Sequence, residues 1–184
     1  MLHKQPLAEQ FIIYGELDDV SKVDIKLLRN HTLSSFADTL DSSHLRWKKH
    51  YRKVNYHQHI QWVQDYIRDH WREKYDFTLV PLVNDGISGL IQQTNEVIPV
   101  HQHIDEFNLH GSPDYSALYC VGMGEKQSSI TIHYDDGRRR MRSWTIQMKV
   151  GQFIVWPSHL KHEIDKNTNK DFLVNLSFKY QRLD

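Results

Sequence analysis

The chain has 184 residues, of which 39% are hydrophobic and 11% are aromatic, so it can bury the core of one domain. Lysine plus arginine and aspartate plus glutamate each number 23, and this balance leaves no global field that would attract nucleic acid or a membrane surface. The single cysteine, Cys120, excludes an intramolecular disulfide framework and thiolate-rich zinc or iron–sulfur sites.

The N-terminal residues contain no apolar signal region, and no uninterrupted apolar run approaches membrane-spanning length. We therefore expect a cytoplasmic protein without a membrane partner. An arginine-rich run at residues 138–142 could hold an anion such as nucleic acid, but a solvated hairpin edge is the favoured interpretation. Nucleic acid is thus disfavoured as a partner, and the sequence leaves the oligomeric state open.

Residues 1–76 are predicted to form an N-terminal helical region. Apolar residues recur at helical spacing in residues 23–28 and again in residues 56–71. In the second segment they fall on one stripe, as expected for a helix with one face on a core: Ile60, Val63, Tyr66, Ile67 and Trp71. We expect this region to pack on the remainder of the chain within one structural domain.

Residues 77–184 are predicted to form a β core. Short apolar runs alternate there with clusters of Gly, Pro, Asn and Asp, a spacing typical of a sandwich or barrel. Asp136-Gly137 lies between two of the runs and is a strong hairpin signal. The fold class is therefore mainly β with N-terminal helices, consistent with a jelly roll. The predicted strands are residues 78–83, 97–100, 115–121, 130–134, 143–148, 152–156 and 172–180.

Two segments of the predicted β core carry metal-ligand chemistry. His103 and Asp105 are two residues apart, so in an extended segment their side chains point to the same face. His162 follows an apolar strand that Pro157 is expected to end, because proline cannot donate to a β-ladder. Two histidines and one carboxylate are the ligand set that holds non-haem Fe(II) and leaves positions open for substrate and dioxygen. The predicted metal ligands are therefore His103, Asp105 and His162.

Two other histidines compete for a place in this site. His101 has the same strand parity as His103 and could be the ligand instead, or a hydrogen-bond donor behind the ligands. His103 is favoured because it pairs with Asp105. His159 lies three residues before His162, and a surface or pocket-rim role is favoured for it.

The order of three segments resembles the Fe(II)/2-oxoglutarate-dependent dioxygenases. Residues 150–162 resemble the segment that ends in the family's distal histidine, where an apolar strand and Phe-Pro-Ser precede the ligand. Residues 101–119 resemble the upstream half of the same signature, and residues 172–178 resemble the closing strand. The similarity covers roughly residues 95–180. It is greatest to the branch encoded by phages and marine bacteria and to the prolyl-hydroxylase-like group.

The resemblance implies a fold, a reaction and a cosubstrate. The fold would be a cupin-like double-stranded β-helix, and the cofactors would be Fe(II) and 2-oxoglutarate. The reaction would be hydroxylation of a small-molecule or peptidyl substrate by dioxygen, with succinate and CO2 as co-products. Family analogy slightly favours a peptidyl residue such as proline. The sequence itself does not identify the substrate.

The chain departs from the family where a basic residue of the closing strand would bind the distal carboxylate of 2-oxoglutarate. At the corresponding inward positions it has Asp171 or Leu173, and neither can pair with a carboxylate. We expect Lys170 to do so, with Tyr119 and Asn175 as hydrogen-bond partners of the cosubstrate. Alternative basic residues are Lys179, Arg142 and Lys149.

Two other functions remain open at this point. The missing arginine is compatible with a cupin-like metal enzyme that does not use 2-oxoglutarate. A noncatalytic jelly-roll binding module with degenerate ligands is the other alternative. Iron-dependent formation of succinate would separate the dioxygenase from both, and metal content would separate the two alternatives from each other.

Overall fold

The structure is a computed structural model that describes residues 11–17, 22–38, 50–73, 75–83, 86–137 and 140–183; in residues 36–38 it describes only the backbone. Its helices are α1 (Ile25–Asp38), α2 (Gln58–Arg72) and the short 3-10 helix η3 (Leu109–Gly111). Its strands are β1 (Ile13–Glu16), β2 (Tyr51–Lys53), β3 (Thr78–Pro81), β4 (Ile87–Gln92), β5 (Ile98–His101), β6 (Tyr115–Gly122), β7 (Ser129–Asp135), β8 (Met141–Gln147), β9 (Gln152–Pro157), β10 (Lys161–Ile164) and β11 (Leu173–Leu183).

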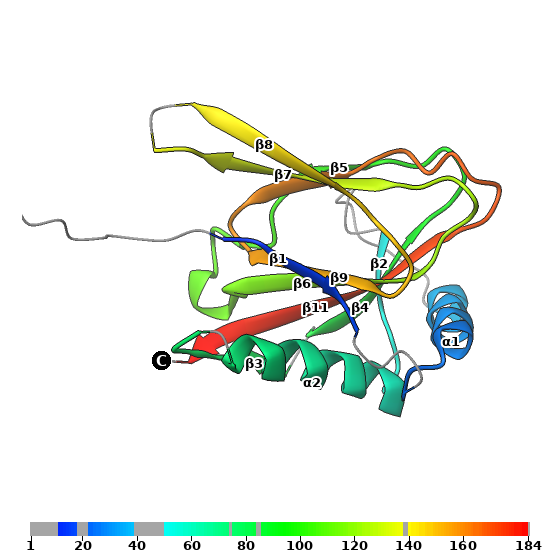
Figure 1. Ribbon diagram of the computed structural model, residues 1–184, viewed down its shortest axis with the longest axis horizontal. Coiled ribbons are helices and arrows are strands. Elements are labelled where there is room, and N and C mark those ends of the chain that lie inside the picture. The colour runs from blue at the N-terminus through cyan, green and yellow to red at the C-terminus, as the bar shows by residue number, and fades with distance from the viewer. Residues whose placement is uncertain are drawn as a thin grey trace, which may run out of the picture.

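Two antiparallel sheets form the β core. The larger sheet has the order β1-β9-β6-β11-β4-β2, with β3 paired to β11, and the smaller has the order β5-β10-β7-β8. In Figure 1 the small sheet lies above the large one, while α2 runs along the opposite face of the large sheet. The expected jelly-roll class, mainly β with helices from the N-terminal part, is confirmed.

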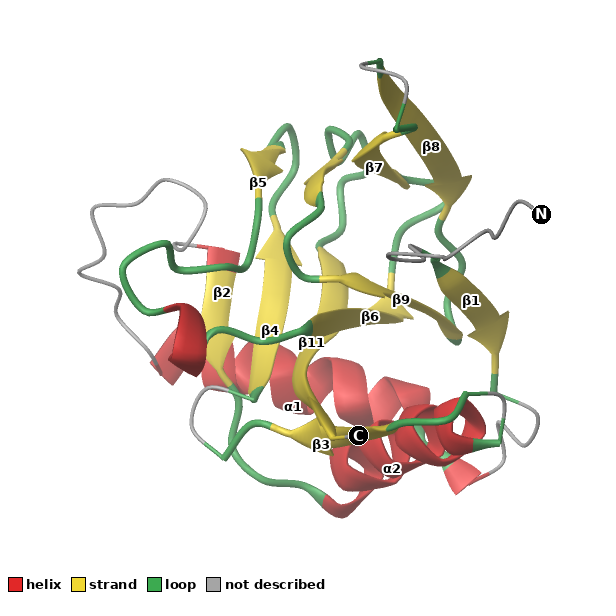
Figure 2. Ribbon diagram, turned by 90° about the vertical axis from the view of Figure 1, so that its left-hand side faces the viewer, coloured by secondary structure: helices red, strands yellow, loops and turns green. Residues whose placement is uncertain are grey.

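The large sheet is buried on both faces, which explains why its central strands are nearly continuous apolar runs. Every residue of β6 and β9 is buried. One face packs on the helices, with Leu28 of α1 and Ile60 and Ile67 of α2 against Leu176 and Phe178 of β11. Figure 2 shows both helices on this outer side. The other face encloses the interior of the jelly roll.

The jelly-roll interior is an apolar core between the two sheets. The large sheet contributes residues such as Leu118, Ile154 and Trp156, and the small sheet contributes Ile130 and Ile132. This core and the helix-facing core are separate clusters. The face on which a β11 residue lies therefore decides whether it can reach the interior.

The predicted elements of the second half agree with the structure to within a few residues. All seven predicted strands are present, and the helix predicted at residues 56–71 is α2, with Ile60, Val63, Ile67 and Trp71 buried. The hairpin β7–β8 turns where predicted, at Gly137, whose φ of 72° favours glycine. Arg142 pairs with Asp136 at 3.0 Å, whereas residues 138 and 139 of the arginine run lie outside the described residues.

The N-terminal region contributes strands as well as helices. β1 pairs with β9 and β2 pairs with β4, so both extend the large sheet. The described part of the N-terminal region therefore adds two strands to the large sheet besides the helices that cover it. Within the described residues, no helix combines the length and apolar character needed to cross a membrane.

Gly89 of β4 is predicted to be intolerant of a side chain. A Cβ at this position would lie 2.6 Å from Cγ2 of Thr32 in α1 and 3.0 Å from Cγ2 of Val54. Gly89→Ala should therefore lower the free energy of unfolding by about 1–3 kcal/mol, because the helix must move away from the sheet. Urea unfolding measures this change, and Ser88→Ala in the same strand is the control. Equal stability of the two variants would contradict the close approach.

Candidate metal centre

Three histidines converge at one end of the jelly-roll interior. His162 of β10 is the direct cross-strand partner of His101 at the end of β5, and His103 lies two residues beyond that end. All three are buried, and their candidate ligand atoms lie within 4.8 Å of one another. The ring centroids of His101 and His162 are 4.2 Å apart, and those of His103 and His162 are 4.8 Å apart.

Hydrogen bonds at the outer ring nitrogens direct the inner nitrogens of these histidines toward one another. The Nδ1 atom of His101 lies 2.8 Å from the Pro99 carbonyl, and that of His162 lies 3.4 Å from the Leu160 carbonyl. Because a carbonyl only accepts, these Nδ1 atoms carry the proton and the Nε2 atoms carry the lone pair. The Nδ1 atom of His103 lies 2.7 Å from the Ser116 hydroxyl. This is the arrangement that second hydrogen bonds impose on metal-binding histidines.

Burial keeps the three imidazoles neutral. It lowers the pKa of His101 to about 4, and it lowers the pKa values of His103 and His162 well below their usual range. Charge on a neighbouring imidazole lowers the last two values further. Neutral imidazoles are the form that binds metal.

Tyr51 of β2 adds an oxygen to the same cluster. Its hydroxyl lies 3.1 Å from Nε2 of His101 and 3.2 Å from Nε2 of His103. Nε2 of His162 is buried and has no hydrogen-bond partner within the part of the chain that the structure describes. A phenol carries one proton, so Tyr51 can donate to only one of the nitrogens that face it.

Asp105 lies outside this cluster. It is exposed, and its carboxylate accepts a hydrogen bond from the Phe107 backbone N–H at 3.0 Å. Strand β5 ends at His101, so the extended parity that would carry Asp105 to the same face as His103 is lost in the following turn. The structure thus brings His103 and His162 together as expected, and it places His101 beside them instead of Asp105.

The closing strand presents polar groups to the interior. Asn175, Ser177 and Lys179 alternate along β11 with Leu176 and Phe178, which face the helices. Both amide atoms of Asn175 and the hydroxyl of Ser177 are buried without a hydrogen-bond partner among the described residues. Each such group costs about 1–3 kcal/mol unless something pairs with it.

Lys179 of this strand brings a positive charge near His103. It is the cross-strand partner of Ser116, whose hydroxyl contacts His103, and its positive charge lowers the pKa of His103. The side chain is half-buried. Of the basic residues considered from the sequence, it is the one for which the structure records an interaction with the histidine cluster.

The other expected cosubstrate residues lie elsewhere. Lys170 is exposed, and its backbone carbonyl accepts from the Thr94 hydroxyl at 3.2 Å. Tyr119 is buried in the core between the large sheet and the helices, on the face opposite the jelly-roll interior. Arg142 and Lys149 are exposed. Of the three residues predicted to bind the cosubstrate, Asn175 faces the interior.

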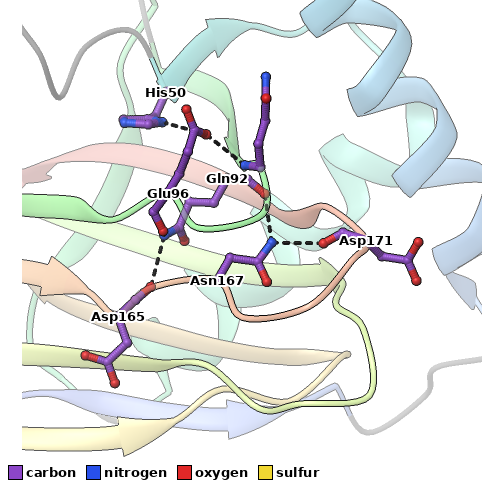
Figure 3. Close-up of polar contacts among 7 residues, drawn as sticks. His50, Gln92, Glu96, Asp165, Asn167 and Asp171 are labelled. Atoms are coloured by element: carbon purple, nitrogen blue, oxygen red, sulfur yellow. Dashed lines mark hydrogen bonds and ion pairs between the residues drawn. The ribbon is translucent and has the colours of Figure 1, made fainter.

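A polar network fixes the segments around β2, β4 and β5, as Figure 3 shows. His50, just before Tyr51, lies 3.6 Å from the Glu96 carboxylate in the β4–β5 turn. The Gln92 amide donates to the backbone carbonyls of Glu96 and Asp165, at 3.2 and 3.0 Å. The Asn167 amide in turn donates to the carbonyls of Gln92 and Asp171. These bonds join the strand that carries Tyr51 to the segments beside the histidines.

Similar solved structures share this fold. A prolyl-4-hydroxylase from Pseudomonas putida has a TM-score of 0.60 at 11% identity and covers 97% of this chain and 96% of its own. The non-haem α-ketoglutarate-dependent carbocyclase SnoK from nogalamycin biosynthesis has a TM-score of 0.59 at 8% identity, with 94% and 79% covered. The non-haem monooxygenase ThoJ, solved as a nickel complex, has a TM-score of 0.56 at 12% identity, with 91% and 73% covered.

Comparison by sequence gives no match, either to a protein-family model or to a curated protein. At these identities the structural likeness establishes the architecture and not the reaction. The chain thus has the fold that the sequence resemblance implied, namely the jelly roll shared with these non-haem oxygenases.

The buried neutral histidines predict a pH dependence of stability for the metal-free protein. The pKa of His162 is lower in the folded than in the unfolded chain. The neutral imidazole therefore contributes fully to the free energy of unfolding above the ordinary pKa near 6.5, and this contribution is lost as pH falls below that value. The wild type should lose about 1 kcal/mol of stability between pH 7 and pH 5.5 through His162, and His162→Gln should not show this loss. Denaturant unfolding at both pH values measures this, with the exposed His110→Gln as control. An unchanged pH dependence in His162→Gln would contradict a neutral buried imidazole.

Proposed function

We propose that this chain is an Fe(II)- and 2-oxoglutarate-dependent oxygenase whose metal ligands are His101, His103 and His162. The observation that supports it is the convergence of three buried imidazoles, whose candidate ligand atoms lie within 4.8 Å of one another. Imidazole suits iron, as it suits zinc, copper and nickel, so the donor type fits the proposed metal. The donor set differs from the usual two histidines and one carboxylate in having nitrogen as the third ligand.

Bound iron would use dioxygen to hydroxylate a C–H bond while 2-oxoglutarate is oxidised to succinate and CO2. The chain's own part is to hold neutral ligands, exclude water and position the reactants. The Trp156 ring, with its centroid 4.8 Å from that of His162, packs beside the cluster and keeps water away from it. Ser116 and Ser158, whose hydroxyls are 2.7 Å apart, form a buried chain behind His103.

For the cosubstrate we propose Lys179, Asn175 and Ser177 in place of the residues expected from the sequence. The proximity of Lys179 to His103 supports an ionic contact between its ammonium group and a carboxylate of 2-oxoglutarate. The unpaired amide of Asn175 and hydroxyl of Ser177 could hydrogen-bond the same molecule. All three lie on one face of β11 and so could contact one ligand.

The substrate is proposed to place an apolar group beside the metal centre. A cavity of about 310 Å³ is lined by Phe11, Ile12, Tyr14, Tyr134, Trp144 and Leu160. Leu160 links it to the site, because its carbonyl lies 3.4 Å from Nδ1 of His162. Aromatic and aliphatic walls suit a hydrocarbon or ring, and a prolyl side chain of a peptide is one group of that kind.

A metal enzyme that does not use 2-oxoglutarate is the second candidate. The observation that favours it is the third imidazole, which replaces the carboxylate of the usual triad. The two candidates share the metal centre and differ in their response to the cosubstrate, so one pair of binding experiments separates them.

The first experiment tests the ligand set. Without oxygen, wild-type protein should bind one Fe(II) per chain and gain thermal stability, about 2.7 kcal/mol when free metal is one hundred times its dissociation constant. His101→Ala and His162→Ala should lose this gain, whereas Asp105→Asn should keep it, because Asp105 is exposed and outside the cluster. Metal content and melting temperature are the measurements. Loss of binding in Asp105→Asn with retention in His101→Ala would reverse the assignment.

The second experiment tests the cosubstrate. In the presence of Fe(II), 2-oxoglutarate should stabilise the protein further, and Lys179→Met should weaken its binding about 10-fold to 100-fold, as expected for loss of a charged hydrogen bond. Lys170→Met is the matched control and should bind as the wild type does, since Lys170 is exposed. Titration calorimetry gives both dissociation constants. Metal binding without any response of the wild type to 2-oxoglutarate would support the second candidate function.

A further inference from the structure

Tyr51 occupies a position that the three-histidine site does not explain. Its hydroxyl lies 3.1 and 3.2 Å from the Nε2 atoms of His101 and His103, and its ring meets both imidazoles edge-on, at interplanar angles of 72° and 89°. The oxygen, rather than the ring face, is thus directed at the nitrogens proposed to bind metal.

The two distances match those between neighbouring ligands of one metal ion. Nitrogen and oxygen ligands lie about 2.0–2.2 Å from a first-row metal. Two such atoms at one ion are then about 2.9 Å apart at a right angle and about 3.4 Å apart at the tetrahedral angle. The separations of the Tyr51 oxygen from His101 and His103 fall between these limits.

The surroundings hold Tyr51 in this place. Tyr51 is the cross-strand partner of Leu90, whose side chain belongs to the jelly-roll core. The preceding residue, His50, is buried and lies 3.6 Å from Glu96, as Figure 3 shows. The pairing of β2 with β4 and the contact between His50 and Glu96 hold the backbone that carries the phenol.

A buried nitrogen also favours a cation at this point, because Nε2 of His162 has no hydrogen-bond partner among the described residues. The positive charge of a bound metal ion would stabilise an ionised ligand such as a phenolate.

We infer that Tyr51 is a fourth protein ligand of the metal, binding through its phenolate oxygen. This inference rests on the metal site proposed above. On binding, the phenol O–H bond breaks, an oxygen–metal bond forms and the proton passes to the buffer, with no change in the oxidation state of the metal. Four protein ligands leave two positions on a six-coordinate ion, so Tyr51 must withdraw before a bidentate cosubstrate and dioxygen can both bind.

The test is spectroscopic and independent of turnover. Wild-type protein loaded with Fe(II) without oxygen and then oxidised with ferricyanide should show a visible tyrosinate-to-Fe(III) charge-transfer band, with tyrosinate vibrations in resonance Raman spectra. Tyr51→Phe should still bind one iron per chain but lack both signals. Tyr180→Phe is the matched control, because it removes another buried phenol, one that donates to the Gln64 carbonyl at 3.2 Å far from the histidines; it should retain both.

Each outcome has a distinct meaning. Iron bound at one per chain with no tyrosinate signal in the wild type would overturn the inference and leave the proposed function in place. A signal that persists in Tyr51→Phe would overturn it as well, since the ligand would be another tyrosine. Failure of the wild type to bind iron would overturn the proposed function and the inference together. The wild-type spectrum decides the matter even if Tyr51→Phe does not fold.

Discussion

The pairing of β10 with β5 is the constraint on which the candidate site depends. Its register sets His162 directly opposite His101, and a shift of one residue would turn His162 to the other face of the sheet. On its other side β10 pairs with β7 over four residues, which fixes the same register independently. Two imidazoles therefore face each other because of backbone hydrogen bonds, before any metal is considered.

The interior around this pair is built at a cost to stability. Within the described residues, an imidazole nitrogen of His162, the amide of Asn175 and the hydroxyl of Ser177 are buried without hydrogen-bond partners, whereas positions such as Leu118 and Ile154 are apolar. Buried polar groups without partners are uncommon in native proteins, and they are found where a ligand completes them. We therefore propose metal and cosubstrate at one site.

Sequence periodicity was sufficient for seven strands of the second half and for α2, because their apolar residues face well-defined cores. It did not locate β1, β2, β4 or β10, which pair with strands distant in the chain. A similar limit explains why the sequence favoured Asp105, and not His101, as the third ligand. Parity in an extended segment correctly placed His101 and His103 on one side, but the segment turns before Asp105, whose carboxylate accepts from the Phe107 backbone. The spacing of His101 and His103 was the sequence signal for a third imidazole at the site. The sequence contained no signal that placed Tyr51 there.

We propose a metal centre of three imidazoles without the Asp105 carboxylate. X-ray absorption at the iron K-edge of the anaerobic Fe(II) complex measures this ligand set, because the outer-shell scattering of imidazole rings can be counted. Three imidazoles per iron are expected in the wild type, with the Asp105→Asn spectrum unchanged. Two imidazoles in the wild type, together with an altered spectrum in Asp105→Asn, would disprove the three-imidazole centre.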